Sequence, residues 1–326
     1  MPRPSPVDPS SSSVDDDPLG AFDVGELRIR KPPPAWTTAA IVSSVLAWGG
    51  LAVHNLRALP RFDGVPPVSF DRVRASAKFI PRSALFALRV GTFLFGIFFV
   101  GYHMIYEERK KHTDGMEYLS DWTILLLFAT EGALGLSMYR KEREEGDLNG
   151  LANALTIAYA TTWTMNLVAS AGAWFSFFAY PMCATLEGVD DYPKCYLEWY
   201  RLTEHAANIV VLFLEFLCGA MPIRRRDFGW PILFMEAYVL FSWFSFWRSG
   251  KVVYDMFAFS KGLESLAWHN GAFLGTTAAF FIALRLHQRK GYRTAPGVRA
   301  AGPFIVARVD GEGAGEADPL VDRPKT

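Results

Sequence analysis

Long apolar blocks separated by short charged connectors fill the central part of the chain. They occupy residues 84–106, 122–139, 151–180, 206–223, 230–247 and 268–286. A helix needs about 20 apolar residues to cross a bilayer core about 30 Å thick. Charged or aromatic residues bound each block, as at a membrane interface. The pattern predicts an all-α fold, a polytopic bundle of six transmembrane helices.

A further block at 36–56 is long enough to cross, but it is rich in small residues and has His54 near its end. We expect it to be either an additional N-terminal span or a helix that lies in the interface. The chain then divides into an N-terminal tail, this block with a basic linker, the six-helix domain and a C-terminal tail, at residues 1–35, 36–82, 83–288 and 289–326.

Apolar residues make up 51% of the chain, and the two tails are instead rich in Pro, Ser, Gly and Asp, which predicts disorder. The formal net charge is zero and no basic run is interleaved with aromatics, which argues against a nucleic-acid partner. Residues 1–20 hold no apolar stretch that would serve as a signal peptide, so we expect the first spanning helix to direct insertion.

Lysine and arginine in short connectors mark the cytoplasmic side of a membrane protein. In a six-span arrangement the most basic connectors fall on one side, with Arg57, Arg61, Arg72, Arg74, Lys78, Arg82, Arg224, Arg225, Arg226, Arg289, Lys290 and Arg293. This predicts a multi-pass protein of an endomembrane or the plasma membrane with a cytoplasmic C-terminus. Cys183 and Cys195 then share a non-cytoplasmic connector, where oxidising conditions permit a disulfide, so we expect them to pair; the alternative is two free thiols in the connector. Cys218 is expected to be a buried, inert thiol.

Ionisable side chains within a span are costly in lipid, so each one raises a question of function. Glu131, Glu215 and Glu236 lie within apolar blocks. Arg89 also does, but it is close enough to the cytoplasmic end for its side chain to extend into the interface. We therefore expect no role for Arg89.

Two polar stripes follow from helical spacing. His205, Asn208 and Glu215 share one face of the fourth span, and Ser120 and Glu131 share one face of the second. Polar faces are expected to point into the bundle, where the two stripes would meet.

The same orientation places Ser120 and His205 at helix N-termini at similar depth. His205 would then accept the proton of Ser120 during attack on an ester carbonyl, and free N–H groups at the helix starts would stabilise the oxyanion. The alternative is structural: Ser120 and Asp121 would cap a helix, and the glutamates would form hydrogen bonds between helices.

A metal site is a further alternative, because His103, His205 and His269 are expected near the same membrane boundary. No paired-His or Glu-x-x-His motif accompanies them, so no metal or other cofactor is expected. A transporter is also less favoured, since no pair of Gly- or Pro-broken helices stands out.

Two short motifs carry a resemblance to a known family. The stretch Tyr118-Leu119-Ser120-Asp121-Trp122 resembles the Tyr-Leu-Thr-Asn-Trp signature that opens a span in the rolling stone proteins. The stretch from Glu204-His205 through Asn208 to Glu215 resembles their His-x-x-Asn motif, which ends in an acidic residue. The similarity covers most of residues 84–286 and extends to the related androgen-induced family.

The resemblance to the androgen-induced family implies a multi-pass membrane hydrolase that cleaves fatty acid esters of hydroxy fatty acids with a Thr nucleophile and a His. Those two positions fall on Ser120 and His205, with Ser in place of Thr. Asn208, Glu215 and Glu131 would be supporting polar groups, and the partners would be membrane lipid and an acyl ester substrate. The rolling stone side instead implies a non-enzymatic protein of cell-surface interaction or fusion.

Overall fold

The computed structural model describes residues 35–58, 68, 70–77, 80–111, 118–139, 145–179, 199–249, 253–254 and 257–290. Most of these residues are helical and none lies in a strand; an isolated β-bridge joins Ser76 and Gly219. The helices are α1 (Ala35–Ala58), α2 (Phe70–Arg74), α3 (Arg82–Lys111), α4 (Leu119–Tyr139), α5 (Glu145–Ala179), α8 (Trp199–Leu202), η3 (Thr203–Ala207), α9 (Asn208–Cys218), η4 (Arg225–Phe228), α10 (Gly229–Ser249), η6 (Phe259–Lys261) and α11 (Leu263–Arg289). The all-α prediction is confirmed for this part of the chain.

Each predicted block contains a helix, and three helical segments of the described residues are long and apolar enough to cross a membrane. They are Ala35–Ala58, Arg82–Tyr102 and Leu119–Tyr139, which makes the chain compatible with a membrane protein. The fourth block was expected to be helical to residue 223, but α9 ends at Cys218. It ends there because Cys218 and Ala220 exchange backbone hydrogen bonds with the segment 75–77. Residues 1–34 and 291–326 of the predicted tails lie outside the described residues.

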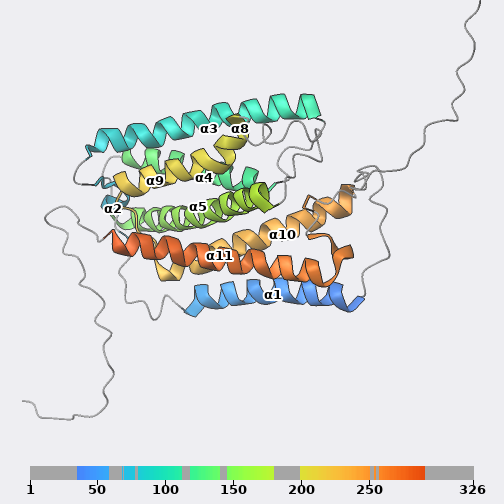
Figure 1. Cartoon of the computed structure of the whole chain (residues 1–326). Coiled ribbons are helices and arrows are strands. Elements are labelled where there is room, and N and C mark those ends of the chain that lie inside the picture. Colours follow the sequence, from blue (N-terminus) through green and yellow to red (C-terminus); the bar gives the residue numbers. More distant parts are fainter. Residues whose placement is uncertain are drawn as a thin grey trace, which may run out of the picture.

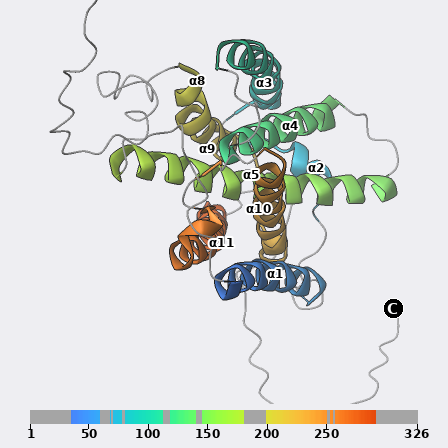
Figure 2. The same cartoon turned by 90° about the vertical axis from the view of Figure 1, so that its right-hand side faces the viewer.

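Helix α5 is the centre of the bundle. In both views it lies between α3, α4 and α9 on one side and α1, α10 and α11 on the other (Figures 1 and 2). Its middle turns are buried on all sides, including polar Thr156, Thr162 and Asn166. Small and polar residues are typical of helix contacts in lipid, where apolar burial gives little driving force.

Large apolar side chains cover the outside of the bundle. Leu94 and Phe98 on α3, Phe213 on α9, Trp247 on α10 and Ile282 on α11 are all more than half exposed. Threonine, serine, asparagine and glutamate side chains fill buried positions at the same time. Apolar surface of this extent marks a face that contacts lipid or another protein rather than water.

The helix ends gather into two groups. At one end Arg74 Nη2 donates to the Met138 carbonyl at 3.4 Å, and Lys290 Nζ donates to the Gly219 carbonyl at 2.5 Å. We call this the basic end, because its segments carry Arg57, Arg72, Arg74, Arg82, Arg224, Arg225, Arg226, Arg289 and Lys290. At the opposite end, here named the aromatic end, the Leu119 N–H donates to the Tyr254 hydroxyl at 3.2 Å.

Helix α1 is an integral part of the bundle. Asn270 Oδ1 on α11 accepts hydrogen bonds from Ser44 Oγ at 2.7 Å and from Trp48 Nε1 at 3.1 Å. The Trp48 ring also stacks on Phe273 with 5.5 Å between centroids. Of the two readings of this block, the packing favours a helix that runs with the bundle over one that lies apart from it in the interface.

Candidate functional site

The start of α4 at the aromatic end is held by its own first turn. The Asp121 carboxylate accepts the Tyr118 N–H at 3.1 Å, the back-bond that an acidic residue makes in a capping box. Ser120 lies in the first turn between them and is buried, with 7% exposure. The capping role therefore belongs to Asp121 and not to Ser120.

His205 does not lie at a helix N-terminus, which corrects the expectation from the sequence. It lies in a π-helical turn, Thr203–Ala207, that joins α8 to α9 without a break in helical backbone. The backbone N–H groups around His205 are therefore not those of a helix start. Single π-turns inside helices occur frequently at functional sites.

The imidazole of His205 is largely enclosed, with 18% of the side chain exposed. Its Nδ1 has no hydrogen-bond partner within the described part of the chain, and its Nε2 lies 3.8 Å from Glu204 Oε2. Burial lowers the pKa of His205 to about 4; Arg201 adds to this effect and Asp121 opposes it. His205 precedes the fourth predicted span, and at neutral pH its ring is uncharged and able to accept a proton.

Ser120 and His205 are on neighbouring elements, since η3 packs against α4, and the charge of the adjacent Asp121 acts on the imidazole. No hydrogen bond joins the two side chains, both of which are described. A small hollow beside the imidazole is lined by Ala173, Trp174, Arg201, Leu202 and His205. A catalytic contact between Ser120 and His205 stays a prediction.

Of the predicted N–H donors at the start of α4, most have acceptors. The Leu119 N–H donates to Tyr254, and the N–H groups of Asp121 and Trp122 donate to the Tyr118 carbonyl. The expected set of free donors is therefore reduced: in the part of the chain that the structure describes, the Ser120 N–H is the one donor of this turn without an acceptor.

Asn208 reaches α4 through a residue that the sequence did not single out. Its Nδ2 donates to Asn166 Oδ1 on α5 at 2.9 Å, and Asn166 Nδ2 donates to the Thr123 carbonyl at 3.1 Å. Ser170 Oγ donates to Asn208 Oδ1 at 3.2 Å. The sequence feature that could have identified Asn166 is its amide side chain within the apolar block 151–180.

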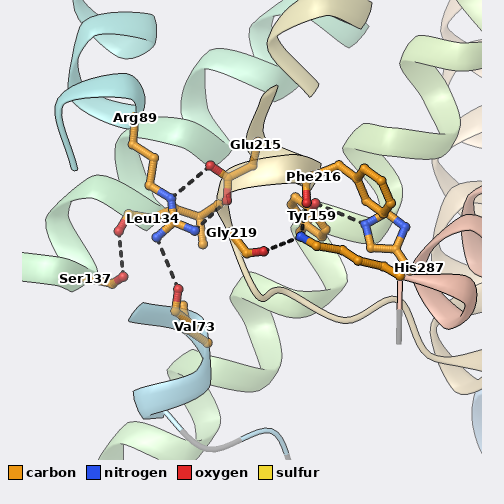
Figure 3. Close-up of polar contacts among 10 residues, drawn as sticks. Val73, Arg89, Leu134, Ser137, Tyr159, Glu215, Phe216, Gly219 and His287 are labelled. Atoms are coloured by element: carbon orange, nitrogen blue, oxygen red, sulfur yellow. Dashed lines mark hydrogen bonds and ion pairs between the residues drawn. The ribbon is translucent and has the colours of Figure 1, made fainter. Parts of the chain in front are cut away.

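Glu215 pairs with Arg89, whose side chain does not extend to the interface as expected. Arg89 Nη2 and Nε donate to the two carboxylate oxygens at 2.5 and 3.2 Å, and neither side chain is exposed. Nη1 donates to the Val73 carbonyl at 3.1 Å. Figure 3 shows the guanidinium between Glu215 and Val73. The pair joins α3 to α9, and the bidentate geometry explains why a charged residue is retained inside the bundle.

Glu131 lies fully buried near this ion pair. Glu215 disfavours the ionised form of Glu131 and Arg89 favours it, and neither carboxyl oxygen of Glu131 has a hydrogen-bond partner in the described part of the chain. Asn208 thus reaches α4 through Asn166 and the Thr123 carbonyl, while Glu131 lies near Arg89 and Glu215 without a hydrogen bond to either. Direct contact between the two predicted stripes stays a prediction.

The alternative of a three-histidine metal site gains no support from His269. Its Nδ1 donates to the Ser265 carbonyl at 2.7 Å and its Nε2 accepts the Trp243 Nε1–H at 3.1 Å, so both ring nitrogens are occupied. Among the described residues no three metal-ligating side chains gather. The side chain of His103 and the predicted disulfide partners Cys183 and Cys195 lie outside the described residues, and Cys218 is a buried free thiol.

Comparison with protein-family models, with curated proteins and with solved structures finds no match for this chain. The resemblance to the rolling stone and androgen-induced proteins therefore stays a prediction based on the two motifs.

Proposed function

We propose that this chain is a membrane-embedded lipid ester hydrolase of the Ser/Thr–His type, with Ser120 as nucleophile and His205 as general base. The observation that carries the proposal is the imidazole of His205, enclosed in a π-helical turn with Nδ1 unpartnered among the described residues. That turn packs against α4, whose first turn contains Ser120. A buried, neutral imidazole beside a hydroxyl is the arrangement that a serine nucleophile needs.

The chemistry follows the two-step scheme of acyl transfer. His205 takes the hydroxyl proton as Ser120 Oγ attacks the ester carbonyl, and the imidazolium then protonates the departing alkoxide. Water attacks the acyl-enzyme with His205 again as base, which releases the acid and restores both groups. The negative charge of Asp121 favours the imidazolium, so Asp121 would be a positioning residue.

The developing oxyanion would lie at the N-terminus of α4. The Ser120 N–H and the positive end of the helix dipole are the groups that remain there once Leu119 has donated to Tyr254. Asn208 and Glu215 hold α9 to α5 and α3, and this fixes the position of the π-turn that carries His205.

We also propose that the six predicted spans and α1 all cross the bilayer, with the basic end and the C-terminus in the cytoplasm. The gathering of arginines at one end supports this orientation. An apolar ester would then reach the aromatic end from the lipid. By resemblance to the androgen-induced family, the substrate class is a fatty acid ester of a hydroxy fatty acid.

The test is hydrolysis of such an ester by the purified full chain in nanodiscs. We expect Ser120→Ala and His205→Ala to abolish turnover and Ser120→Thr to retain it. Ser137→Ala is the matched control, because Ser137 is buried on the same helix at the basic end and donates only to the Leu134 carbonyl. Unchanged turnover in Ser120→Ala and His205→Ala would reject the mechanism.

A second candidate is a non-enzymatic multi-pass protein of the rolling stone type. The observation that favours it is that Asn208 and Glu215 already have structural partners in Asn166, Ser170 and Arg89. In this reading the polar stripes only pack helices. It predicts no ester turnover in the wild type, together with normal folding of Ser120→Ala.

A further inference from the structure

Glu131 carries a buried carboxyl group that takes no part in the hydrolysis steps proposed above. It lies in the middle of α4, eleven residues from Ser120, and its side chain has 0% exposure. Both of its oxygens lack a hydrogen-bond partner among the described residues. A buried polar group is normally paired, so the exception calls for a physical explanation.

The charged groups around Glu131 decide which protonation state of its carboxyl group is favourable. Three packed helices face it with Arg89 from α3, Glu215 from α9 and Tyr159 from α5, while Arg74 of α2 lies at Met138 near the end of α4. Each guanidinium nitrogen of Arg89 already donates to Glu215 or to Val73. An ionised Glu131 would place a second negative charge in the interior with one cation for two carboxylates, which is strongly unfavourable.

A neighbouring hydrogen bond provides a path for a proton. His287 Nδ1 lies 2.8 Å from the Ala283 carbonyl, which can only accept, so Nδ1 carries hydrogen and Nε2 is the acceptor. The Tyr159 hydroxyl, 3.1 Å away, therefore donates to Nε2 (Figure 3). The charge of Lys290 acts on His287, and Lys290 Nζ donates to the Gly219 carbonyl at the basic end.

We propose that Glu131 is a proton-binding site in the bundle interior, and that it exchanges its proton with the basic end through Tyr159 and His287. In the forward step the Glu131 O–H bond breaks and its proton passes, through one water molecule, to the Tyr159 oxygen. The proton of Tyr159 moves to His287 Nε2 in the same step. The products are a carboxylate and an imidazolium, and the net charge is unchanged. The imidazolium then gives one proton to solvent water at the basic end, and the reverse sequence returns a proton to Glu131.

Infrared spectroscopy of the full chain in nanodiscs tests the binding site. A protonated carboxyl group gives a carbonyl band separate from those of carboxylates and amides. We expect this band at neutral pH in the wild type, its loss in Glu131→Gln, and its retention in the control Glu236→Gln. A band that is absent from the wild type, or that persists in Glu131→Gln, would overturn the proposal. Failure of Glu131→Gln to fold would also count against it, because glutamine matches the neutral acid in shape.

Hydrogen–deuterium exchange of the same band tests the path. After transfer to D₂O, the shift of the band should be several-fold slower in Tyr159→Phe than in the wild type, while the band itself remains. Tyr238→Phe is the matched control, since Tyr238 is equally buried but lies against α4 near the aromatic end. Equal exchange rates in wild type, Tyr159→Phe and Tyr238→Phe would remove Tyr159 and His287 from the exchange path.

Discussion

The carboxylate of Glu215 accepts two hydrogen bonds from the guanidinium of Arg89, and neither side chain has any exposed surface. The two residues lie 126 positions apart in the chain, on α9 and α3. An ion pair of this kind ties two helices together in one register, because either charge alone would be left buried and unpaired.

Removing one member of this pair should therefore destabilise the protein strongly. We expect Glu215→Gln to lower the free energy of unfolding by about 3–5 kcal/mol, and the double variant Arg89→Met/Glu215→Leu to lose less than Glu215→Gln alone. Thermal unfolding in detergent measures both. Glu236→Gln, at a half-buried site on α10, is the control, and a loss in Glu215→Gln no greater than in Glu236→Gln would contradict the structure.

Asn166 should be a second point of sensitivity, because its side chain links α5 to both α4 and α9. We expect Asn166→Leu to cost about 1–3 kcal/mol, since it leaves Asn208 without its buried acceptor. Thr164→Val is a matched control two residues away, because Thr164 Oγ1 donates only within its own helix, to the Ala160 carbonyl. Similar unfolding temperatures for Asn166→Leu and Thr164→Val would argue against the link.

The contact between α1 and the start of α10 is testable with glycines. A Cβ on Gly229 would lie 2.7 Å from the Ala52 carbonyl oxygen of α1, a backbone atom that cannot move aside. We expect Gly229→Ala to cost about 1–3 kcal/mol, as overpacked sites do. A Cβ on Gly50 meets nothing within 4 Å, so Gly50→Ala should leave stability unchanged or slightly raised. Equal effects would mean that α1 is not seated as described.

Acid should destabilise the protein through His205. Its pKa is about 4 when folded against an ordinary 6.5, so the folded state binds a proton less readily than the unfolded chain. Above pH 6.5 the ring is neutral in both states, and the free energy of unfolding is unaffected by it. As the pH falls from 6.5 toward 4, the unfolded chain binds the proton first, and the free energy of unfolding decreases by no more than about 1.4 kcal/mol per pH unit. The unfolding temperature of His205→Asn should fall less over this range than that of the wild type or of the control His54→Asn. If the unfolding temperatures of wild type and His205→Asn fall in parallel with pH, the imidazole of His205 is not enclosed as described.

Helix positions could be predicted because a bilayer-length apolar block leaves few alternatives to a helix. The block 36–56 illustrates the limit: its length was clear, but its place in the bundle depends on Asn270 of α11, far along the chain. The end of α9 at Cys218 could not be predicted either, because it depends on backbone hydrogen bonds to a distant segment, 75–77.

The partners of polar residues could not be predicted, because helix rotation and tilt decide which faces meet. Arg89 is near enough to a helix end to extend outward, and only the position of Glu215 shows that it turns inward. The π-turn at His205 similarly has no periodic signal in the sequence. Spacing did indicate correctly that Asn208, Glu215 and Glu131 are buried, because a polar stripe on an apolar helix has to avoid lipid.

Covalent labelling of the full chain with a fluorophosphonate, followed by peptide mass spectrometry, tests whether Ser120 is a nucleophile activated by His205. We expect one adduct, on Ser120, that disappears in Ser120→Ala, falls sharply in His205→Ala and persists in Ser137→Ala. An adduct on another residue, or labelling of Ser120 that does not depend on His205, would contradict the proposed mechanism.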